Sequence, residues 1–145
     1  MATRAAKTAI TGSSVTESSG TENSVSDIWS AEELTEVRER LLAEIDELHT
    51  EILRAETELA AGNASEGAGD DPADAGAKTY EREREIALTL NARDVLAQNE
   101  RAIARIDAGT YGVCESCQRP IGKERLQAFP RATLCVACKQ REERR

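Results

Sequence analysis

The sequence predicts a mainly α-helical protein, in which a long antiparallel two-helix coiled-coil hairpin carries a small C-terminal zinc finger. Three observations support this fold class. Two long segments repeat apolar residues at helical spacing, four cysteines form two C-x-x-C pairs, and aromatic residues make up only 3% of the 145 residues. With 32% charged residues, little material remains for a large globular core. An elongated helical protein with a metal staple therefore fits best.

Three segments follow from the change in composition along the chain. Residues 1–27 are rich in Ser, Thr, Ala and Gly. They have too few large apolar groups to offset the entropy of ordering, so we expect a disordered tail. Residues 28–108 are expected to form the hairpin, with an acidic tip near residues 70–76. Residues 109–145 are expected to form a four-cysteine (C4) zinc finger and a C-terminal helix.

The first helix has a clear start. Ser30 and Glu33 can form a capping box, and Trp29 and Leu34 occupy the two positions of a hydrophobic staple. Apolar residues then recur with a period near 3.5, which is typical of a coiled coil. This apolar stripe comprises Leu34, Leu41, Ile45, Leu48, Ile52, Ala55 and Leu59. We expect the helix to run to about Ala61, where a Gly-Asn sequence should end it.

An acidic turn is expected over residues 62–76, which also contain the start of a second helix. Asp71 is a suitable N-cap, and Pro72 suits the first helical position. The second helix should run to about Asp107, where residues 108–112 break it. Its expected apolar stripe is Leu88, Ala92, Val95, Leu96, Ala102, Ile103 and Ile106, with Asn99 as a polar interruption. Two long helices joined by a short loop pack antiparallel.

The four cysteines are Cys114, Cys117, Cys135 and Cys138. Two residues between the members of a pair let one turn present both sulfurs to the same ion, and residues 118–134 let the chain loop back. This spacing predicts one zinc per chain, held by four thiolates. Two alternatives are a pair of disulfides and a redox C-x-x-C motif, although redox motifs usually occur singly near a βαβ pattern. His49, the only histidine, lies far from the cysteines, so we expect no zinc role for it.

The composition disfavours several functions. The net charge of −8 and the pI of about 4.8 oppose non-specific binding to nucleic acid. The chain has no apolar stretch for a membrane span or secretory signal. A cytoplasmic location is therefore expected, where paired cysteines favour zinc over disulfides. No nucleophile–base pair or phosphate-binding glycine loop stands out, so we do not expect an enzyme.

The acidic tip has two interpretations. Asp71 and Asp74 can be ordinary polar residues that cap a helix at a solvated turn. Alternatively, a rigid rod presents the two carboxylates as its working end. Of the two, Asp71 is the better candidate for a local cap, so we expect Asp74 to matter more for function.

The chain resembles the DksA/TraR family of bacterial RNA polymerase regulators. The motifs that carry the resemblance are Asp71-Pro72-Ala73-Asp74, Tyr111-Gly112-Val113-Cys114-Glu115-Ser116-Cys117, Ile121-Gly122, Arg125-Leu126 and Leu134-Cys135-Val136-Ala137-Cys138. The resemblance covers residues 29–140. It departs from the family pattern at Gly76, where a tip alanine is usual, and at Gln118, where glycine is common.

The resemblance implies a transcription regulator that binds RNA polymerase directly and does not bind specific DNA sequences. Such proteins insert the hairpin tip into the secondary channel of the polymerase and change initiation, and Asp71 and Asp74 match the two aspartates of the tip. Some members share a site for the alarmone ppGpp with the polymerase, built from basic residues. The corresponding positions here are Asn91, Gln98, Phe129 and Lys139. Only Lys139 is basic, so weak or absent use of ppGpp is expected, unless Arg93, Arg101 or Arg131 reaches the same space.

Two other functional classes remain open. A zinc-ribbon adaptor for nucleic acid or protein would use a basic finger, and the finger contains Lys123, Arg125, Arg131 and Phe129. A thiol-based redox sensor would instead cycle its cysteines with release of zinc.

Overall fold

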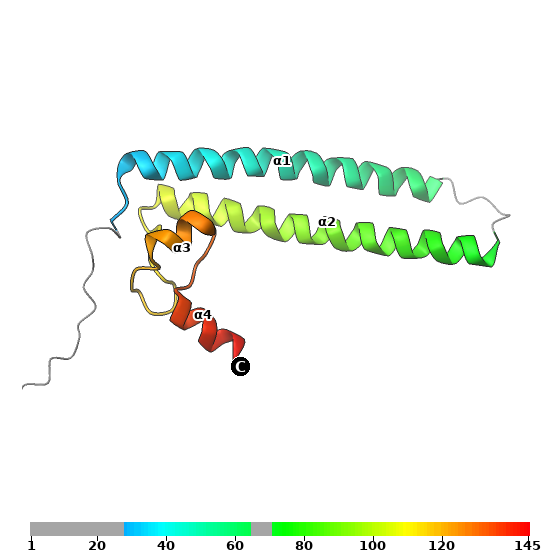
Figure 1. Cartoon of the computed structure of the whole chain (residues 1–145). Coiled ribbons are helices and arrows are strands. Elements are labelled where there is room, and N and C mark those ends of the chain that lie inside the picture. The colour runs from blue at the N-terminus through cyan, green and yellow to red at the C-terminus, as the bar shows by residue number, and fades with distance from the viewer. Residues whose placement is uncertain (1–27, 65–70) are drawn as a thin grey trace, which may run out of the picture.

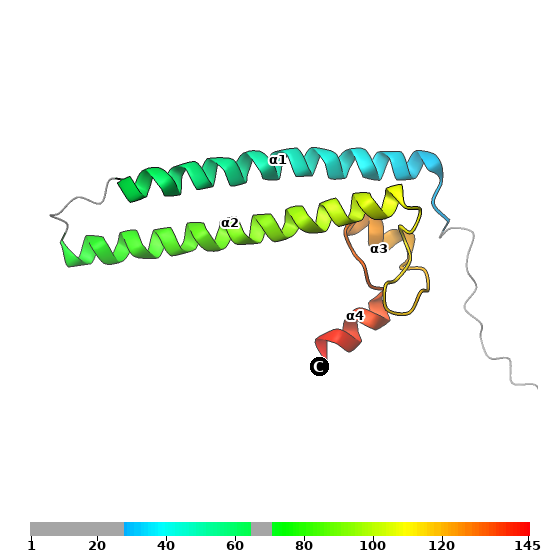
Figure 2. The same ribbon diagram turned by 180° about the vertical axis from the view of Figure 1, so that it is seen from behind.

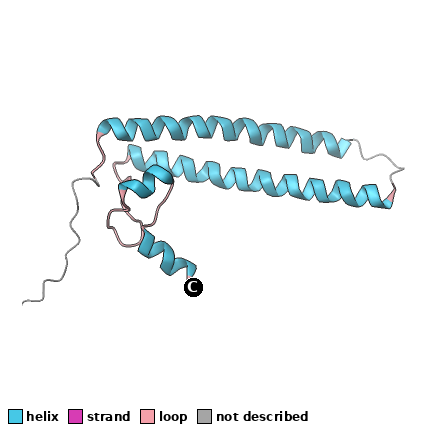
Figure 3. Cartoon of the chain, in the orientation of Figure 1, coloured by secondary structure: helices cyan, strands magenta, loops and turns pink. Residues whose placement is uncertain are grey.

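Four helices make up the part of the chain that the computed structural model describes, residues 28–64 and 71–145. The long helices α1 (Ala31–Ala64) and α2 (Pro72–Asp107) run antiparallel, and the short helices α3 (Lys123–Ala128) and α4 (Val136–Glu143) follow them (Figure 1). Helices and loops account for the described residues, with one isolated bridge between Val113 and Pro120 (Figure 3). The expected fold class is confirmed, whereas the disorder expected for residues 1–27 concerns residues outside the described part.

The capping box at the start of α1 is present. The backbone N–H of Ser30 donates to Glu33 Oε2 over 2.9 Å, and the N–H of Glu33 donates to Ser30 Oγ over 3.2 Å. Trp29 and Leu34, the two staple residues, both pack against the core. The local sequence therefore fixes where the first helix begins.

The end of α1 differs from the prediction. The helix continues through Gly62 and Asn63 to Ala64. Glycine ends a helix when its backbone turns left-handed, but Gly62 is not among the glycines with positive φ. A glycine that keeps helical angles only weakens a helix, by about 1 kcal/mol. Because α2 begins at Pro72, the turn is also shorter than the expected residues 62–76, and Glu66 and Asp70 in it lie outside the described residues.

The end of α2 at Asp107 matches the prediction. Thr110 N–H donates to the carbonyl of Arg105, and Gly109 N–H donates to that of Ile106. These two bonds form a Schellman motif, which places Gly109 at φ 74°. The chain can therefore leave the helix sharply and enter the finger.

The two long helices pack along the predicted stripes, with local differences. The stripe of α1 faces inward, and Val37 joins it. On α2, however, Leu88 is 53% exposed while its neighbour Thr89 is buried. The inner face of α2 passes through positions 89, 92, 96 and 99, so Leu88 falls on the flank. Asn99, expected as a polar interruption, is fully buried.

The finger packs against the end of the hairpin where α1 begins and α2 ends (Figures 1 and 2). Trp29 and Tyr111 meet there edge to face, with ring centroids 5.4 Å apart. Gly112, at φ 88°, lets the indole approach, because a Cβ at this position would lie 3.1 Å from Trp29 Nε1. The core cluster spans both modules and contains Val37, Leu41, Ala102, Tyr111, Cys114, Ile121, Leu126 and Cys138.

Candidate metal centre

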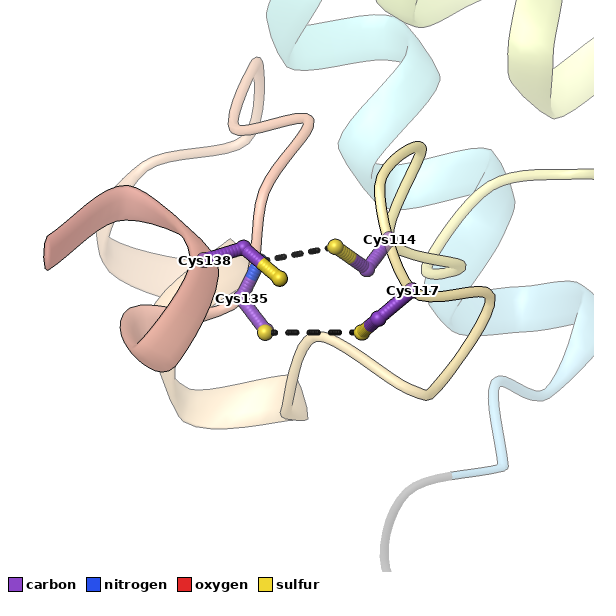
Figure 4. Close-up of side chains that lie close together, drawn as sticks. All are labelled: Cys114, Cys117, Cys135 and Cys138. Carbon is purple, nitrogen blue, oxygen red and sulfur yellow. Dashed lines mark hydrogen bonds between the residues drawn. The ribbon is translucent and has the colours of Figure 1, made fainter. Parts of the chain in front are cut away.

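The chain brings its four cysteines together in the finger. Their sulfur atoms all lie within 4.8 Å of one another (Figure 4). The Cys117 and Cys135 sulfurs are 3.8 Å apart, close to the roughly 3.8 Å that a tetrahedron with Zn–S bonds of about 2.3 Å requires. A disulfide would need about 2.05 Å, and all four cysteines are free. The donor set and its spacing therefore fit one zinc ion.

A turn positions the two sulfurs of the first pair, and the start of α4 positions those of the second. In the first pair, Gln118 N–H donates to the carbonyl of Cys114 over 2.9 Å and closes the turn. Gln118 itself has φ 60°, the left-handed conformation that favours glycine. In the second pair, Cys135 is the N-cap of α4 and Cys138 lies in its first turn. The expected helix after the second pair is present, and it ends at Glu143.

Backbone N–H groups around the first pair favour thiolates. Burial alone would raise the pKa of Cys114, but N–H donors from Cys135, Cys117 and Ser116 outweigh it and lower that pKa to about 6. The pKa of Cys117 is also lowered, chiefly by the backbone and side chain of Arg119. Since zinc binds the thiolate and not the thiol, the shifts at Cys114 and Cys117 favour metal binding. At Cys135 the N–H of Cys138 lowers the pKa, but burial and the neighbouring cysteines outweigh it, so the pKa of Cys135 is raised.

Two arginines beside the sulfurs were missed by the sequence analysis. Arg141 Nη2 donates to Cys138 Sγ over 2.9 Å, and Arg119 is the residue that chiefly lowers the pKa of Cys117. A basic residue two or three positions after the second cysteine of each pair could have indicated them. The contacts between the finger and α1 could not be predicted from sequence spacing either, because they join residues far apart in the chain.

These long-range contacts fasten the finger to α1. Lys123 Nζ lies 2.5 Å from Glu33 Oε1 and 5.5 Å from the centre of the Trp29 ring. The hydrogen bond from Lys123 is the main reason that the pKa of Glu33 is lowered. Arg131 Nη1 lies 3.2 Å from Glu44 Oε1. The metal-site module is thus held in a defined position at the base of the hairpin.

The two expected sites lie at opposite ends of the molecule. Asp71 and Asp74 are exposed where α2 begins, at the end of the hairpin away from the finger (Figure 1). Asp71 occupies the N-cap position, but its carboxylate makes no capping hydrogen bond. Its carbonyl accepts from Ala75 N–H over 3.0 Å. The expectation that the Asp71 side chain caps the helix is therefore wrong, because the carbonyl closes the turn and leaves the carboxylate in solvent.

Comparison with known proteins gives three kinds of match. Residues 109–144 match the model of the prokaryotic dksA/traR C4-type zinc finger. The RNA polymerase-binding transcription factor DksA of Caulobacter vibrioides is 36% identical over 75 residues, which cover 52% of this chain and 53% of the relative. The uncharacterized protein YteA of Bacillus subtilis is 45% identical over 62 residues, or 43% of this chain and 26% of the relative. The matched segments thus span about half or less of these curated relatives.

The fold is also similar to a solved structure. Transcription factor DksA2 from Pseudomonas aeruginosa superposes with a TM-score of 0.66 and 29% sequence identity, covering 79% of this chain and 86% of that one. The likeness therefore includes the hairpin as well as the finger. Four cysteines placed to bind one metal ion, a matching zinc-finger model and a shared hairpin architecture agree. The finger of this chain, residues 109–144, is therefore a C4-type zinc finger of the dksA/traR kind, and it stands at the base of a hairpin similar to that of DksA2.

Proposed function

We propose that this protein regulates transcription by binding RNA polymerase directly and inserting its hairpin tip into the secondary channel to modulate initiation. One observation carries the proposal. A long helical hairpin with a four-cysteine finger at its base presents two exposed carboxylates at its far end, in a fold similar to that of a solved transcription factor. Relatives of this chain carry the name RNA polymerase-binding transcription factor.

The dimensions of the hairpin support a tip that works at a distance. Helix α2 has 36 residues, which corresponds to about 54 Å at about 1.5 Å per residue. Residues 71–81 are all exposed, so this end of the helix contributes little to the core. The exposed end of the hairpin adds little buried surface to the core. It does extend the tip away from the finger, which suits a protein that inserts this tip into a channel. None of the described helices is long and apolar enough to cross a membrane.

The metal centre would serve as the base of this arm. Cys114, Cys117, Cys135 and Cys138 would each supply one thiolate to a single zinc ion. Such an ion supplies folding free energy to a small module that lacks a large core of its own. In this role the finger orients the hairpin and carries out no chemistry, so we propose no enzymatic activity.

The contacts of the finger weigh against the nucleic-acid adaptor. Lys123 and Arg131 are engaged with Glu33 and Glu44 on α1, and Arg125 Nε donates to the carbonyl of Leu134 over 3.2 Å. These cations, which an adaptor would use on phosphates, hold the module together instead. Phe129 remains 62% exposed.

Weak use of ppGpp is part of the proposal. Lys139, the single basic residue among the four corresponding positions, lies 3.0 Å from the carboxylate of Glu142. An anionic ligand would have to compete with this pairing and would find no second cation among Asn91, Gln98 and Phe129. Charge-assisted hydrogen bonds contribute about 1.5–3 kcal/mol each, so losing several removes most of the affinity.

The test is a promoter assay with tip variants and the cognate polymerase. Asp71→Asn and Asp74→Asn should each reduce the change in open-complex lifetime, because each removes an exposed negative charge at the tip without altering side-chain shape. Asp94 is an exposed aspartate farther along α2, so the Asp94→Asn variant is the matched control and should act as the wild type does. Added ppGpp should change the response little.

Full activity of the double variant Asp71→Asn/Asp74→Asn would refute the role of the tip. Strong synergy with ppGpp that disappears in Lys139→Ala would refute the weak use of the alarmone.

A further inference from the structure

Exposed apolar residues gather in the middle of the hairpin. Nine large apolar side chains are exposed in the described part of the chain, and four of them lie in this one region. Single exposed apolar residues are ordinary on a protein surface, whereas residues that gather mark a contact surface. The four residues are Leu53 on α1 and Ile86, Leu88 and Leu90 on α2.

Two contacts between the long helices show that these residues lie at one level. A cavity of about 220 Å³ is lined by Ala55 of α1 and by Leu88 and Ala92 of α2, among others. An ion pair joins Glu56 of α1 to Arg93 of α2. The middle of α1 therefore lies beside this part of α2 (Figure 1). We call the four exposed residues at this level the apolar belt.

Three members of the apolar belt share one flank of the hairpin. Leu53 lies three residues before Glu56, and Leu90 lies three residues before Arg93. Because residues three apart share a helix face, both leucines lie on the flank that carries the Glu56–Arg93 ion pair. Ile86 lies four residues before Leu90, so it belongs to the same flank.

Leu88 lies on the opposite flank. Successive residues of an α-helix turn by about 100°, so Leu88 points about 200° away from both Ile86 and Leu90. It lines the cavity between the helices, and among the described residues that line this cavity neither Glu56 nor Arg93 occurs. The apolar belt therefore presents side chains on two opposite flanks of the hairpin.

This placement restricts the shape and chemistry of a partner. A flat partner, such as a second copy of the chain packed alongside, covers one flank only, so covering both requires a partner that surrounds the hairpin. Charged groups beside the cavity already have partners in their own helices, Arg54 with Glu58 and Arg84 with Glu81. The contact that remains for a partner at this level is apolar.

We propose that the apolar belt is the surface by which two facing walls of the polymerase secondary channel hold the inserted hairpin. The inference rests on the proposed function and names the surface that supplies its affinity. Leu88 lies 14 residues after Asp74, which corresponds to about 21 Å along α2. An inserted tip would therefore carry the belt into the channel behind it, where apolar side chains of the walls would cover the leucines.

The experiment titrates the labelled, zinc-loaded full chain with purified cognate polymerase. Leu88→Gln alters one flank, and the double variant Leu53→Gln/Leu90→Gln alters the other. Glutamine has a similar size and favours helices, so both variants should keep the hairpin, which circular dichroism checks. Each variant should weaken binding by about 10-fold, equivalent to about 1.4 kcal/mol, because these side chains are 53–66% exposed before binding and apolar after it.

Ile28→Gln is the matched control. It removes a more exposed apolar side chain, 70% exposed, at the base of the hairpin and outside the belt, so polymerase binding should stay at the wild-type level. A photocrosslinking amino acid, p-benzoylphenylalanine, placed in turn at positions 53 and 88 should crosslink to polymerase from both positions. Sedimentation of the wild type without polymerase should show a monomer.

Three results would overturn the apolar belt while leaving polymerase binding in place: wild-type affinity in both belt variants, weaker binding when only one flank is altered, or an equal loss in Ile28→Gln. A wild-type dimer that dissociates in Leu88→Gln would show that a second copy of the chain covers the belt, and it would also contradict the proposal. If the wild type does not bind polymerase at all, the proposed function itself fails, and the assignment of the belt fails with it.

Discussion

Gln118 directly follows the first cysteine pair. Its φ of 60° is the only positive φ at a non-glycine residue in the described part of the chain. A side chain in this conformation costs roughly 1–2 kcal/mol, since its Cβ approaches the following carbonyl. The turn persists because the N–H of Gln118 donates to the carbonyl of Cys114, and because the two sulfurs that precede Gln118 must face one ion.

Replacing this residue by glycine should therefore stabilise the finger. We expect Gln118→Gly to raise the free energy of unfolding of the metal-loaded protein by about 1 kcal/mol, after the greater entropy of glycine in the unfolded chain is subtracted. Gln127→Gly is the matched control, because Gln127 lies within α3 and glycine should destabilise a helix by about 1 kcal/mol. Thermal unfolding of the two variants checks the opposite signs, and a destabilised Gln118→Gly would contradict the strain.

The sequence was sufficient for the metal-site residues and insufficient for their surroundings. The C-x-x-C spacing is a local property, so the four cysteines could be predicted to converge. The sequence also shows directly that Gln118 stands where the family that this chain resembles commonly has glycine. Arg141, by contrast, contacts a sulfur only because α4 turns its side chain back toward Cys138, and charged residues near a chain end usually face solvent.

At the scale of the helices, Asn99 interrupts the contact between α1 and α2. It is fully buried, and both atoms of its side-chain amide lack a hydrogen-bond partner among the residues that the structure describes. Leaving a buried polar group unsatisfied costs about 1–3 kcal/mol. A polar residue in a coiled-coil core can, in compensation, fix the register of the helices.

Asn99→Leu should raise the free energy of unfolding of the hairpin by about 1–3 kcal/mol, because a side chain of similar size without polar atoms replaces the amide. Asn91→Leu on the exposed side of the same helix should change stability by no more than about 0.5 kcal/mol. Urea unfolding followed by circular dichroism measures both. A loss of stability in Asn99→Leu would mean that the amide is satisfied in solution, for example by a buried water.

The starts of the two long helices were easier to predict than the end of α1 and the inner face of α2. The capping box of α1 and the Asp-Pro start of α2 are made by adjacent residues, so the sequence defines them. The end of α1 depends on whether Gly62 turns left-handed, which its neighbours do not decide. The inner face of α2 was misjudged at Leu88 because residues 88 and 89 both continue the helical spacing, and only packing against α1 selects Thr89.

On the scale of the whole molecule, the finger and the hairpin share one core. Leu41 of α1, Ala102 of α2 and Leu126 of α3 lie in the same buried cluster. Ion pairs between the modules join residues as far apart as Lys123 and Glu33. Such contacts depend on tertiary packing, so the way in which the finger packs against α1 could not be predicted from spacing. The result is one elongated structure, with the metal centre at one end of the hairpin and the two tip aspartates at the other.

Charge is distributed unevenly over this shape. Residues 109–145 contain eight Lys and Arg and four Asp and Glu, a net charge of +4, whereas the whole chain carries −8. The finger cations Lys123 and Arg131 are paired with acidic residues of α1. The remaining acidic surface belongs mainly to the hairpin, which fits a partner with a basic channel better than it fits nucleic acid.

Direct binding to RNA polymerase is the central claim, and equilibrium titration of the labelled, zinc-loaded full chain with purified cognate polymerase tests it most directly. We predict saturable one-to-one binding at micromolar concentrations or tighter, which corresponds to about −8 kcal/mol or more favourable. The Asp74→Asn variant should bind polymerase with an affinity similar to that of the wild type. In the proposed function the tip changes transcription initiation, whereas the rest of the hairpin and the finger bind the polymerase. Absence of saturable binding well above that concentration would contradict the account.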